Sequence, residues 1–155
     1  MGRTNGLLRN NWIVSELTAI DFQLKLETKL VGDAENSGIQ FRSQAQGNEV
    51  SGYQADIGKG WWGKLYEEHG RVLLSGESGE QDVKPNDWNS YEIVAVGSKI
   101  QTLINGQLCI DLDDPQGSRQ GIIAFQLHSG GKTEVRFRNL SLAVLDPEGK
   151  PGARD

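Results

Sequence analysis

Residues 20–30 alternate between apolar and polar side chains, and this alternation constrains the fold more than any other feature of the sequence. A period of two is that of a β-strand with one buried and one solvated face. The same spacing in a helix would spread apolar residues around all sides, so a strand is predicted. The apolar positions are Ile20, Phe22, Leu24, Leu26 and Leu30, with a threonine in the remaining place of the series.

Shorter segments with the same alternation follow along the chain, separated by turn-forming residues. In residues 99–112, two strand-like runs flank Asn105-Gly106, a pair that readily adopts the positive φ angles of a type I′ turn. No long stretch carries a helical apolar stripe. About nine or ten short strands predict an all-β sandwich or barrel, and the 20 glycines supply its turns.

Composition and missing motifs exclude several classes of function. The formal net charge of −5 leaves no basic stripe for general nucleic-acid binding, and the apolar runs are too short for a membrane-spanning helix. The single cysteine, Cys109, excludes a disulfide framework and a cysteine-based zinc site. Asp111, Asp113 and Asp114 lack the spacing of a calcium loop and are interpreted as turn residues.

The chain is predicted to form a single β-sandwich domain over residues 1–145. The tail, residues 146–155, holds two of the four prolines and a high density of charge, and is predicted to be frayed. Residues 1–11 lack the apolar core of a signal peptide.

Four of the predicted strands place polar side chains at alternate positions, so each strand has one polar face. If these faces belong to one sheet, they could hydrogen-bond a sugar and carry acid–base chemistry. Each side chain could equally be solvated surface, and Arg42 and Asp56 could form an ion pair. In chain order the residues are Gly38, Gln40 and Arg42, then Gln54 and Asp56, then Lys64 and Tyr66, then Gln126 and His128.

Trp61 and Trp62 are adjacent and therefore point to opposite faces if they lie on a strand. Both can be core residues only if both faces are covered. Otherwise one of the two rings is available to stack on the apolar face of a sugar.

Seven segments occur in an order that is typical of one protein family. They are NSGIQFRS at 36–43, GYQADIG at 52–58, WGKLYEE at 62–68, WNSYEI at 88–93, NG at 105–106, IAFQLH at 123–128 and VRFRNL at 135–140. Together they resemble the 3-keto-disaccharide (3-keto-glucoside) hydrolase domain family. The resemblance covers roughly residues 12–145 and implies a concanavalin A-like jelly roll, which is a two-sheet antiparallel β-sandwich.

The chain departs from the family at its beginning. The usual first-strand motif, F-N-G-K-x-L-x-G-W, is not present. We therefore expect a domain that is short of its N-terminal strands, with an exposed sheet edge through which two copies could pair.

The resemblance implies chemistry on a sugar that is already oxidised at C3. A ketone at C3 acidifies the proton on C2, so a base can remove it and form an enolate. The group on C1 then leaves by β-elimination, and water can add back to give net hydrolysis. Such a site needs a base near C2, a positive charge or donor for the enolate, and an acid for the leaving group.

The resemblance and the polar faces together assign residues to these roles. Asp56 or His128 would be the base, and Arg42 with Lys64 would stabilise negative charge. A divalent metal held by Asp56, His128 and Glu68 could instead polarise the ketone. The residues expected to bind the substrate are Gln40, Gln54, Tyr66 and Gln126 for its hydroxyls, and Trp61 or Trp62 for its ring.

Two other functions fit the same sequence features. The fold also serves in non-catalytic carbohydrate-binding modules, since a fold does not fix a function. The chain could also be a structural or assembly domain that uses its sheet edge. For the enzyme, the resemblance implies a periplasmic or extracellular location.

Overall fold

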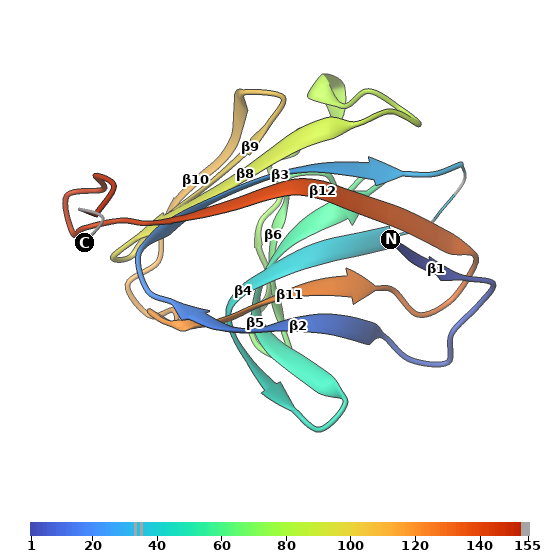
Figure 1. Ribbon diagram of the computed structural model, residues 1–155, viewed down its shortest axis with the longest axis horizontal. Coiled ribbons are helices and arrows are strands. Elements are labelled where there is room, and N and C mark those ends of the chain that lie inside the picture. The colour runs from blue at the N-terminus through green and yellow to red at the C-terminus, as the bar shows by residue number, and fades with distance from the viewer. Residues whose placement is uncertain (33, 35, 153–155) are drawn as a thin grey trace.

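The computed structural model describes residues 1–32, 34 and 36–152 as two antiparallel sheets packed face to face (Figure 1). In this part of the chain the strand orders are β1-β12-β3-β8-β9-β10 and β2-β11-β4-β5-β6-β7. The strands are β1 (Gly2–Thr4), β2 (Asn11–Ala19), β3 (Phe22–Leu30), β4 (Asn36–Gln46), β5 (Glu49–Gly58), β6 (Leu65–Glu68), β7 (Val72–Ser75), β8 (Asn89–Val96), β9 (Lys99–Ile104), β10 (Gln107–Asp113), β11 (Gly121–Leu127) and β12 (Thr133–Val144).

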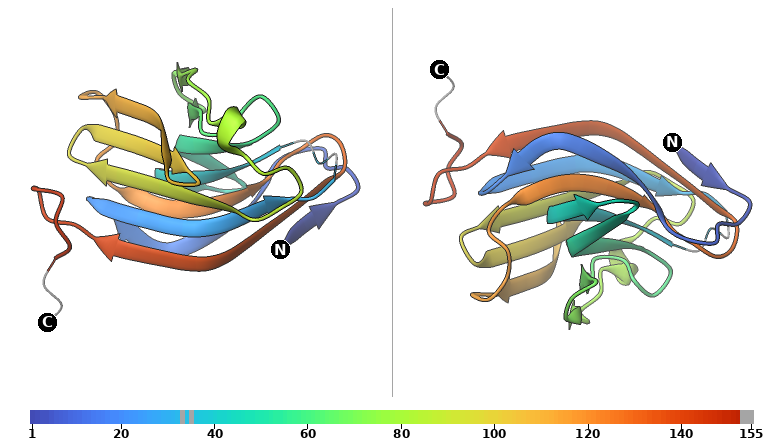
Figure 2. Two further views of the ribbon diagram at one scale, coloured as in Figure 1. Left: turned by 90° about the horizontal axis from the view of Figure 1, so that it is seen from above. Right: turned by 90° about the horizontal axis from the view of Figure 1, so that it is seen from below.

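The predicted two-sheet β-sandwich is confirmed. Strands outnumber the prediction because short ones such as β1 and β7 are too brief to show an alternating pattern. A single 3₁₀ turn, η1 (Glu80–Asp82), lies within the described residues. It sits on the same side of the sandwich as β6 and β7 (Figure 2).

The hydrophobic core lies between the two sheets and follows directly from the alternation. On β3, Phe22, Leu24 and Leu26 are buried while the residues between them are more exposed. The ring of Phe22 meets that of Phe41 from the second sheet edge to face at 6.0 Å, and Phe41 stacks on Tyr53 at 5.3 Å. Burial of each such side chain contributes about 1.5–3 kcal/mol, so this interface holds the sheets together.

The N-terminal segment supplies an edge strand to each sheet. β1 pairs with β12 in the first sheet, and β2 pairs with β11 in the second. Because β2 has no second neighbour in its sheet, one side of this nine-residue strand is an open edge. Pairing of two copies through such an edge stays a prediction.

Residues 146–152 fold back on the end of β12. The amide of Asp146 donates to the carbonyl of Lys150 at 2.8 Å, and Gly152 donates to the carbonyl of Val144 at 3.0 Å. Residues 153–155 of the predicted tail lie outside the described part of the chain. Among the described residues, no helix is long and apolar enough to span a membrane.

A β-bulge in β4 reverses the direction of Arg42. The pairing register with β5 shifts between Phe41 and Gln44, and Arg42 has a φ of 45°. A bulge breaks the alternation of side chains, so Arg42 does not share the face of Gln40. The prediction that Arg42 faces a groove beside Asp56 is therefore wrong.

The guanidinium of Arg42 instead joins β4 to the β2–β3 connection, which runs between the two sheets, and to the β8–β9 turn of the first sheet. It donates to the carbonyls of Ile20 at 2.8 Å and Gly97 at 2.7 Å, and to the carboxylate of Asp21 at 3.0 Å. Asp21 also accepts from the amide of Gly97. The Arg42 side chain is fully buried, so every one of these bonds replaces lost hydration.

We expect Arg42→Met to lower the free energy of unfolding by about 3 kcal/mol, because it leaves buried carbonyls and Asp21 without their partner. Urea denaturation monitored by circular dichroism measures the change. Arg136→Met is the matched control, since Arg136 is 45% exposed where it pairs with Glu134 and should cost less than about 1 kcal/mol. Equal losses in both variants would contradict the assigned role.

Candidate functional site

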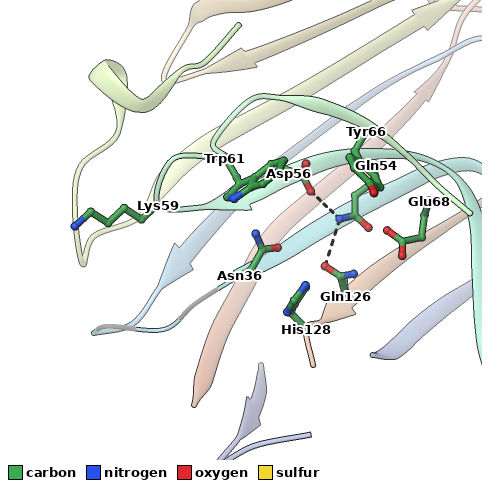
Figure 3. Close-up of a pocket in the computed structure, with 9 residues that line it drawn as sticks. All are labelled: Asn36, Gln54, Asp56, Lys59, Trp61, Tyr66, Glu68, Gln126 and His128. Atoms are coloured by element: carbon green, nitrogen blue, oxygen red, sulfur yellow. Dashed lines mark hydrogen bonds between the residues drawn. The ribbon is translucent and has the colours of Figure 1, made fainter. Parts of the chain in front are cut away.

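A pocket of about 460 Å³ opens on the face of the second sheet that points away from the core (Figure 3). Strands β4, β5, β6 and β11 supply most of its lining, the turn after β5 supplies Lys59 and Trp61, and His128 directly follows β11. The lining residues are Asn36, Gln54, Asp56, Lys59, Trp61, Tyr66, Glu68, Gln126 and His128. Strand alternation correctly predicts that the polar side chains of β5, β6 and β11 meet on one face.

The floor of the pocket exists because Gly38 has no side chain. In the strand register Gly38 lies between Gln126 on β11 and Asp56 on β5. A Cβ at this position would lie 2.6 Å from Cδ of Gln54, which is closer than van der Waals contact allows. The space above Gly38 is thus filled by the Gln54 side chain.

The Gln54 amide links the polar groups of the floor. Its Nε2 donates to Oδ1 of Asp56 at 2.7 Å and to Oε1 of Gln126 at 3.3 Å. Its Oε1 accepts from Nε2 of Gln40 at 3.1 Å, and Gln40 accepts from the Ser43 hydroxyl. Gln40 is fully buried and does not line the pocket, so it orients Gln54 instead of meeting a ligand.

Asp56 is the most strongly perturbed acid of the pocket. Only 3% of the residue is exposed, and this burial raises its pKa to about 7. The hydrogen bond from Gln54 and the charge of Lys64 oppose the rise, while the carboxylate of Glu68 adds to it. A carboxyl group with a pKa near neutrality can both accept and return a proton at physiological pH.

Glu68 and His128 form the other side of the site. Burial raises the pKa of Glu68, and positive charge on His69 and His128 partly offsets the rise. The Nδ1 of His128 contacts the carbonyl of Ser129, which can only accept, so Nδ1 carries a proton. The neutral ring therefore has Nε2 as its acceptor atom.

The two tryptophans lie in the turn after β5 and not on a strand, and their side chains point to different surroundings. Trp61 is 38% exposed and forms a wall of the pocket, with its ring edge-on to Tyr66 at 6.5 Å. Lys64 does not line the pocket, and its Nζ lies 5.1 Å from the centre of the Trp61 ring. Trp62 is only 4% exposed and stacks on Tyr91 in the core, so the alternative that Trp62 stacks on sugar in this pocket is wrong.

The predicted metal ligands are not brought together. In residues 1–32, 34 and 36–152, no group of three or more His, Cys, Asp or Glu side chains is arranged to hold a metal ion. The Gln54 side chain lies between Asp56 and Glu68, and its amide already occupies Oδ1 of Asp56 (Figure 3). The prediction of a metal set of Asp56, His128 and Glu68 is therefore wrong.

Two lining residues, Asn36 and Lys59, are absent from the predicted site. Asn36 begins β4 and pairs with Gly58, and Lys59 lies in the turn that follows. Strand alternation carries no information about the direction of turn residues. One feature of the sequence could have identified Lys59 as a lining residue. The turn that contains it directly follows the strand that carries Gln54 and Asp56.

An ion-pair network holds the β6–β7 hairpin, which forms one wall of the pocket, against the body of the domain. The guanidinium of Arg71 donates two hydrogen bonds to Glu67 and two to Asp114, all between 2.7 and 2.9 Å. The Tyr53 hydroxyl also donates to Asp114. The bonds from Arg71 lower the pKa of Asp114 to about 2, so this predicted turn residue is a fixed anion that anchors the hairpin.

We expect the stability of the protein to fall between pH 4 and pH 7 through Asp56. The unfolded chain loses this proton near its usual pKa of 3.8, whereas the folded chain keeps it up to about pH 7. Over this window the native state binds more protons than the unfolded state, which costs about 4 kcal/mol by pH 7.

Urea denaturation of the wild type and Asp56→Asn at pH 4 and pH 8 tests this expectation. Residue 56 cannot ionise in the variant. The free energy of unfolding of the variant, relative to that of the wild type, should therefore increase by several kcal/mol from pH 4 to pH 8. Parallel pH profiles for the two proteins would show that Asp56 has an ordinary pKa.

Comparison with known proteins agrees with the fold and adds a family. The carbohydrate-binding module CBM66 from Bacillus subtilis is 18% identical, covers 91% of this chain and 84% of its own, and has a TM-score of 0.73. A protein from Parabacteroides distasonis ATCC 8503, provisionally described as a glycosyl hydrolase, is 19% identical over 90% and 86% of the two chains, with a TM-score of 0.67. The homodimeric agglutinin CG-16 from chicken liver is 8% identical over 87% of this chain and 100% of its own, with a TM-score of 0.57. At these identities the likeness shows the fold alone.

The sequence itself carries the family assignment. No curated protein matches it. Residues 3–143, however, match the 3-keto-alpha-glucoside-1,2-lyase-like domain. The chain therefore belongs to the 3-keto-alpha-glucoside-1,2-lyase-like domain family.

Proposed function

We propose that this protein eliminates the C1 substituent from 3-keto-glycosides, with Asp56 as the base that removes the C2 proton. The observation that carries the proposal is a buried carboxyl group, with a pKa of about 7, at the floor of an open polar pocket. The family match supports the substrate class. A base of this pKa is half ionised at neutral pH, so a carboxylate is available to accept a proton. That carboxylate is also more basic than one with an ordinary pKa.

The steps of the reaction balance without an external oxidant. Asp56 takes the C2 proton, and the electron pair of the C2–H bond moves toward the C3 ketone to form an enolate. The pair then forms the C1–C2 double bond as the bond from C1 to the glycosidic oxygen breaks. The leaving oxygen takes a proton, and addition of water across the double bond completes net hydrolysis.

The remaining lining residues fit the other demands of this reaction. His128 and Glu68 lie across the pocket from Asp56, where a protonated group can supply the leaving oxygen. Lys64, whose charge acts on the Asp56 carboxyl group, is a cation that can oppose the negative charge of the enolate, whereas the side chain of Lys59 extends away from the other lining residues (Figure 3). The groups left to hold the sugar are the amides of Asn36, Gln54 and Gln126, the Tyr66 hydroxyl and the Trp61 ring.

A non-catalytic carbohydrate-binding module is the second candidate. The observation that favours it is the pairing of an exposed aromatic wall, Trp61 and Tyr66, with a floor of amides, which suits a sugar ring without any chemistry. Calorimetry with unoxidised glycans distinguishes the two functions. Micromolar binding without turnover of any 3-keto-glycoside would favour the module.

The proposed substrates also bear on location. Glycosides that reach a cell from outside are met first in the periplasm or at the cell exterior, so we propose that the protein acts there. Fractionation of cells that express the natural gene tests this proposal.

We expect Asp56→Asn to lower kcat/KM for a 3-keto-disaccharide by about a thousandfold, because it removes the base while keeping a similar shape. His128→Ala should lower kcat/KM by about tenfold to a hundredfold. Release of reducing sugar measures both. Asp113→Asn is the control, since Asp113 is exposed and lies outside the pocket. Wild-type rates in the first two variants would show that the site is placed wrongly.

The pH dependence of kcat/KM provides an independent check. The base must be ionised, so kcat/KM should rise with pH and level off above the Asp56 pKa of about 7. A plateau that extends unchanged from pH 5 to pH 8 would contradict the assignment of Asp56 as the base.

A further inference from the structure

The β-bulge in β4 that turns Arg42 away from the pocket brings Ser43 beside Gln40. On a regular strand, residues 40 and 42 would lie on the same face. Because the register with β5 shifts directly after Phe41, the Ser43 hydroxyl instead donates to Oε1 of Gln40 at 2.6 Å. Gln40 is fully buried and Ser43 is 1% exposed, so this bond is shielded from water.

Gln40 links Ser43 to the floor of the pocket. In the strand register it lies between Ala124 on β11 and Gln54 on β5. Its Nε2 donates to Oε1 of Gln54 at 3.1 Å, and Nε2 of Gln54 donates to Oδ1 of Asp56 at 2.7 Å (Figure 3). Ser43, Gln40 and Gln54 thus form a buried hydrogen-bond chain in which every member donates toward Asp56.

An ionised Asp56 is compatible with only one orientation of this hydrogen-bond chain. A carboxylate can only accept hydrogen bonds, so Gln54 must present its Nε2 to Asp56 and turn its Oε1 toward Gln40. Oε1 of Gln126 accepts from the same Nε2 at 3.3 Å. If the Gln54 amide turned over, its oxygen would face these two acceptors in a place where burial leaves little water to compensate.

We infer that Gln40 is a positioning residue of the proposed site, since by binding Oε1 of Gln54 it keeps the Gln54 donor on Oδ1 of Asp56 and leaves Oδ2 as the atom that takes the proton. The inference rests on the proposed function only in naming Asp56 as the base. Asp56 lines the pocket, and no described residue donates to its Oδ2. Gln40 lies outside the lining, so it acts through Gln54 and not on the sugar.

Gln40→Met tests the inference, because it removes the amide while keeping a similar length. Without the bond from position 40, the Gln54 amide is free to turn over, and the donor on Asp56 is lost for part of the time. The hydrogen bond from Gln54 lowers the pKa of Asp56, so we expect this pKa to rise by about one in the variant. NMR titration of ¹³C-labelled aspartate carboxyl groups measures the pKa, with the Asp56 signal identified by its loss in Asp56→Asn.

Thr102→Val is the matched control. Thr102 is also fully buried, and its hydroxyl donates to the carbonyl of Gly63 at 2.9 Å, but its side chain has no bond to the hydrogen-bond chain. This variant should leave the pKa of Asp56 unchanged. Ser43→Ala is a milder second variant in case Gln40→Met does not fold. It frees the Gln40 amide to turn over and should raise the same pKa about half as much. A wild-type pKa of Asp56 in both test variants, or an equal rise in Thr102→Val, would overturn the inference.

The pH dependence of kcat/KM separates this inference from the proposed function. At pH 7, Gln40→Met should lower kcat/KM for a 3-keto-disaccharide about fivefold, because less of Asp56 is ionised, and at pH 9 it should match the wild type. If the NMR titration shifts as expected but no 3-keto-glycoside is turned over, the positioning role stands and the proposed function fails. If the wild type turns over the substrate but the pKa of Asp56 does not move and the loss persists at pH 9, the proposed function stands and the positioning role fails.

Discussion

The candidate site depends on one constraint, which is that an amide must fill the space above a glycine. Gly38 lies between Gln126 and Asp56 in the register, and Gln54 leans into the gap to bond both of them. The buried carboxyl group therefore has one fixed partner and little water. The hydrogen bond from Gln54 fixes the orientation of this carboxyl group, whereas burial raises its pKa and outweighs the opposing effect of that bond.

The turn between β5 and β6 shapes the pocket beside that floor. It directs Trp61 to the pocket and Trp62 to the core, so adjacent residues serve two different chemical surroundings. The turn is tied to the η1 loop at Glu80 and to β5 through the carbonyl of Lys64, which accepts from the amide of Asp56 at 3.0 Å.

Alternation in the sequence predicted the sandwich and most of the polar face, because side-chain direction on a regular strand depends only on position. Gln54, Asp56, Tyr66 and Gln126 meet for that reason. Arg42 does not join them, since a bulge with positive φ reverses its direction and no local pattern announced the bulge. The alternation rule does not apply to turn residues such as Lys59. The pKa of Asp56 could not be predicted either, because it depends on burial in the folded chain.

The tether at Arg71 has a consequence for how the pocket meets large ligands. The wall it holds is a hairpin of two four-residue strands at the edge of the sheet. Its base is packed into the core through Leu65 and pairs with β5, whereas its turn end is fastened to the body by the ion pairs of Arg71. Segments held by partly exposed bonds open at lower free energy than the core strands beneath them. Salt weakens a partly exposed ion pair more than a buried core. We therefore expect a rise in ionic strength to loosen this wall of the pocket, and so to widen the entrance, before it unfolds the domain. The floor of the pocket stays rigid under the same conditions.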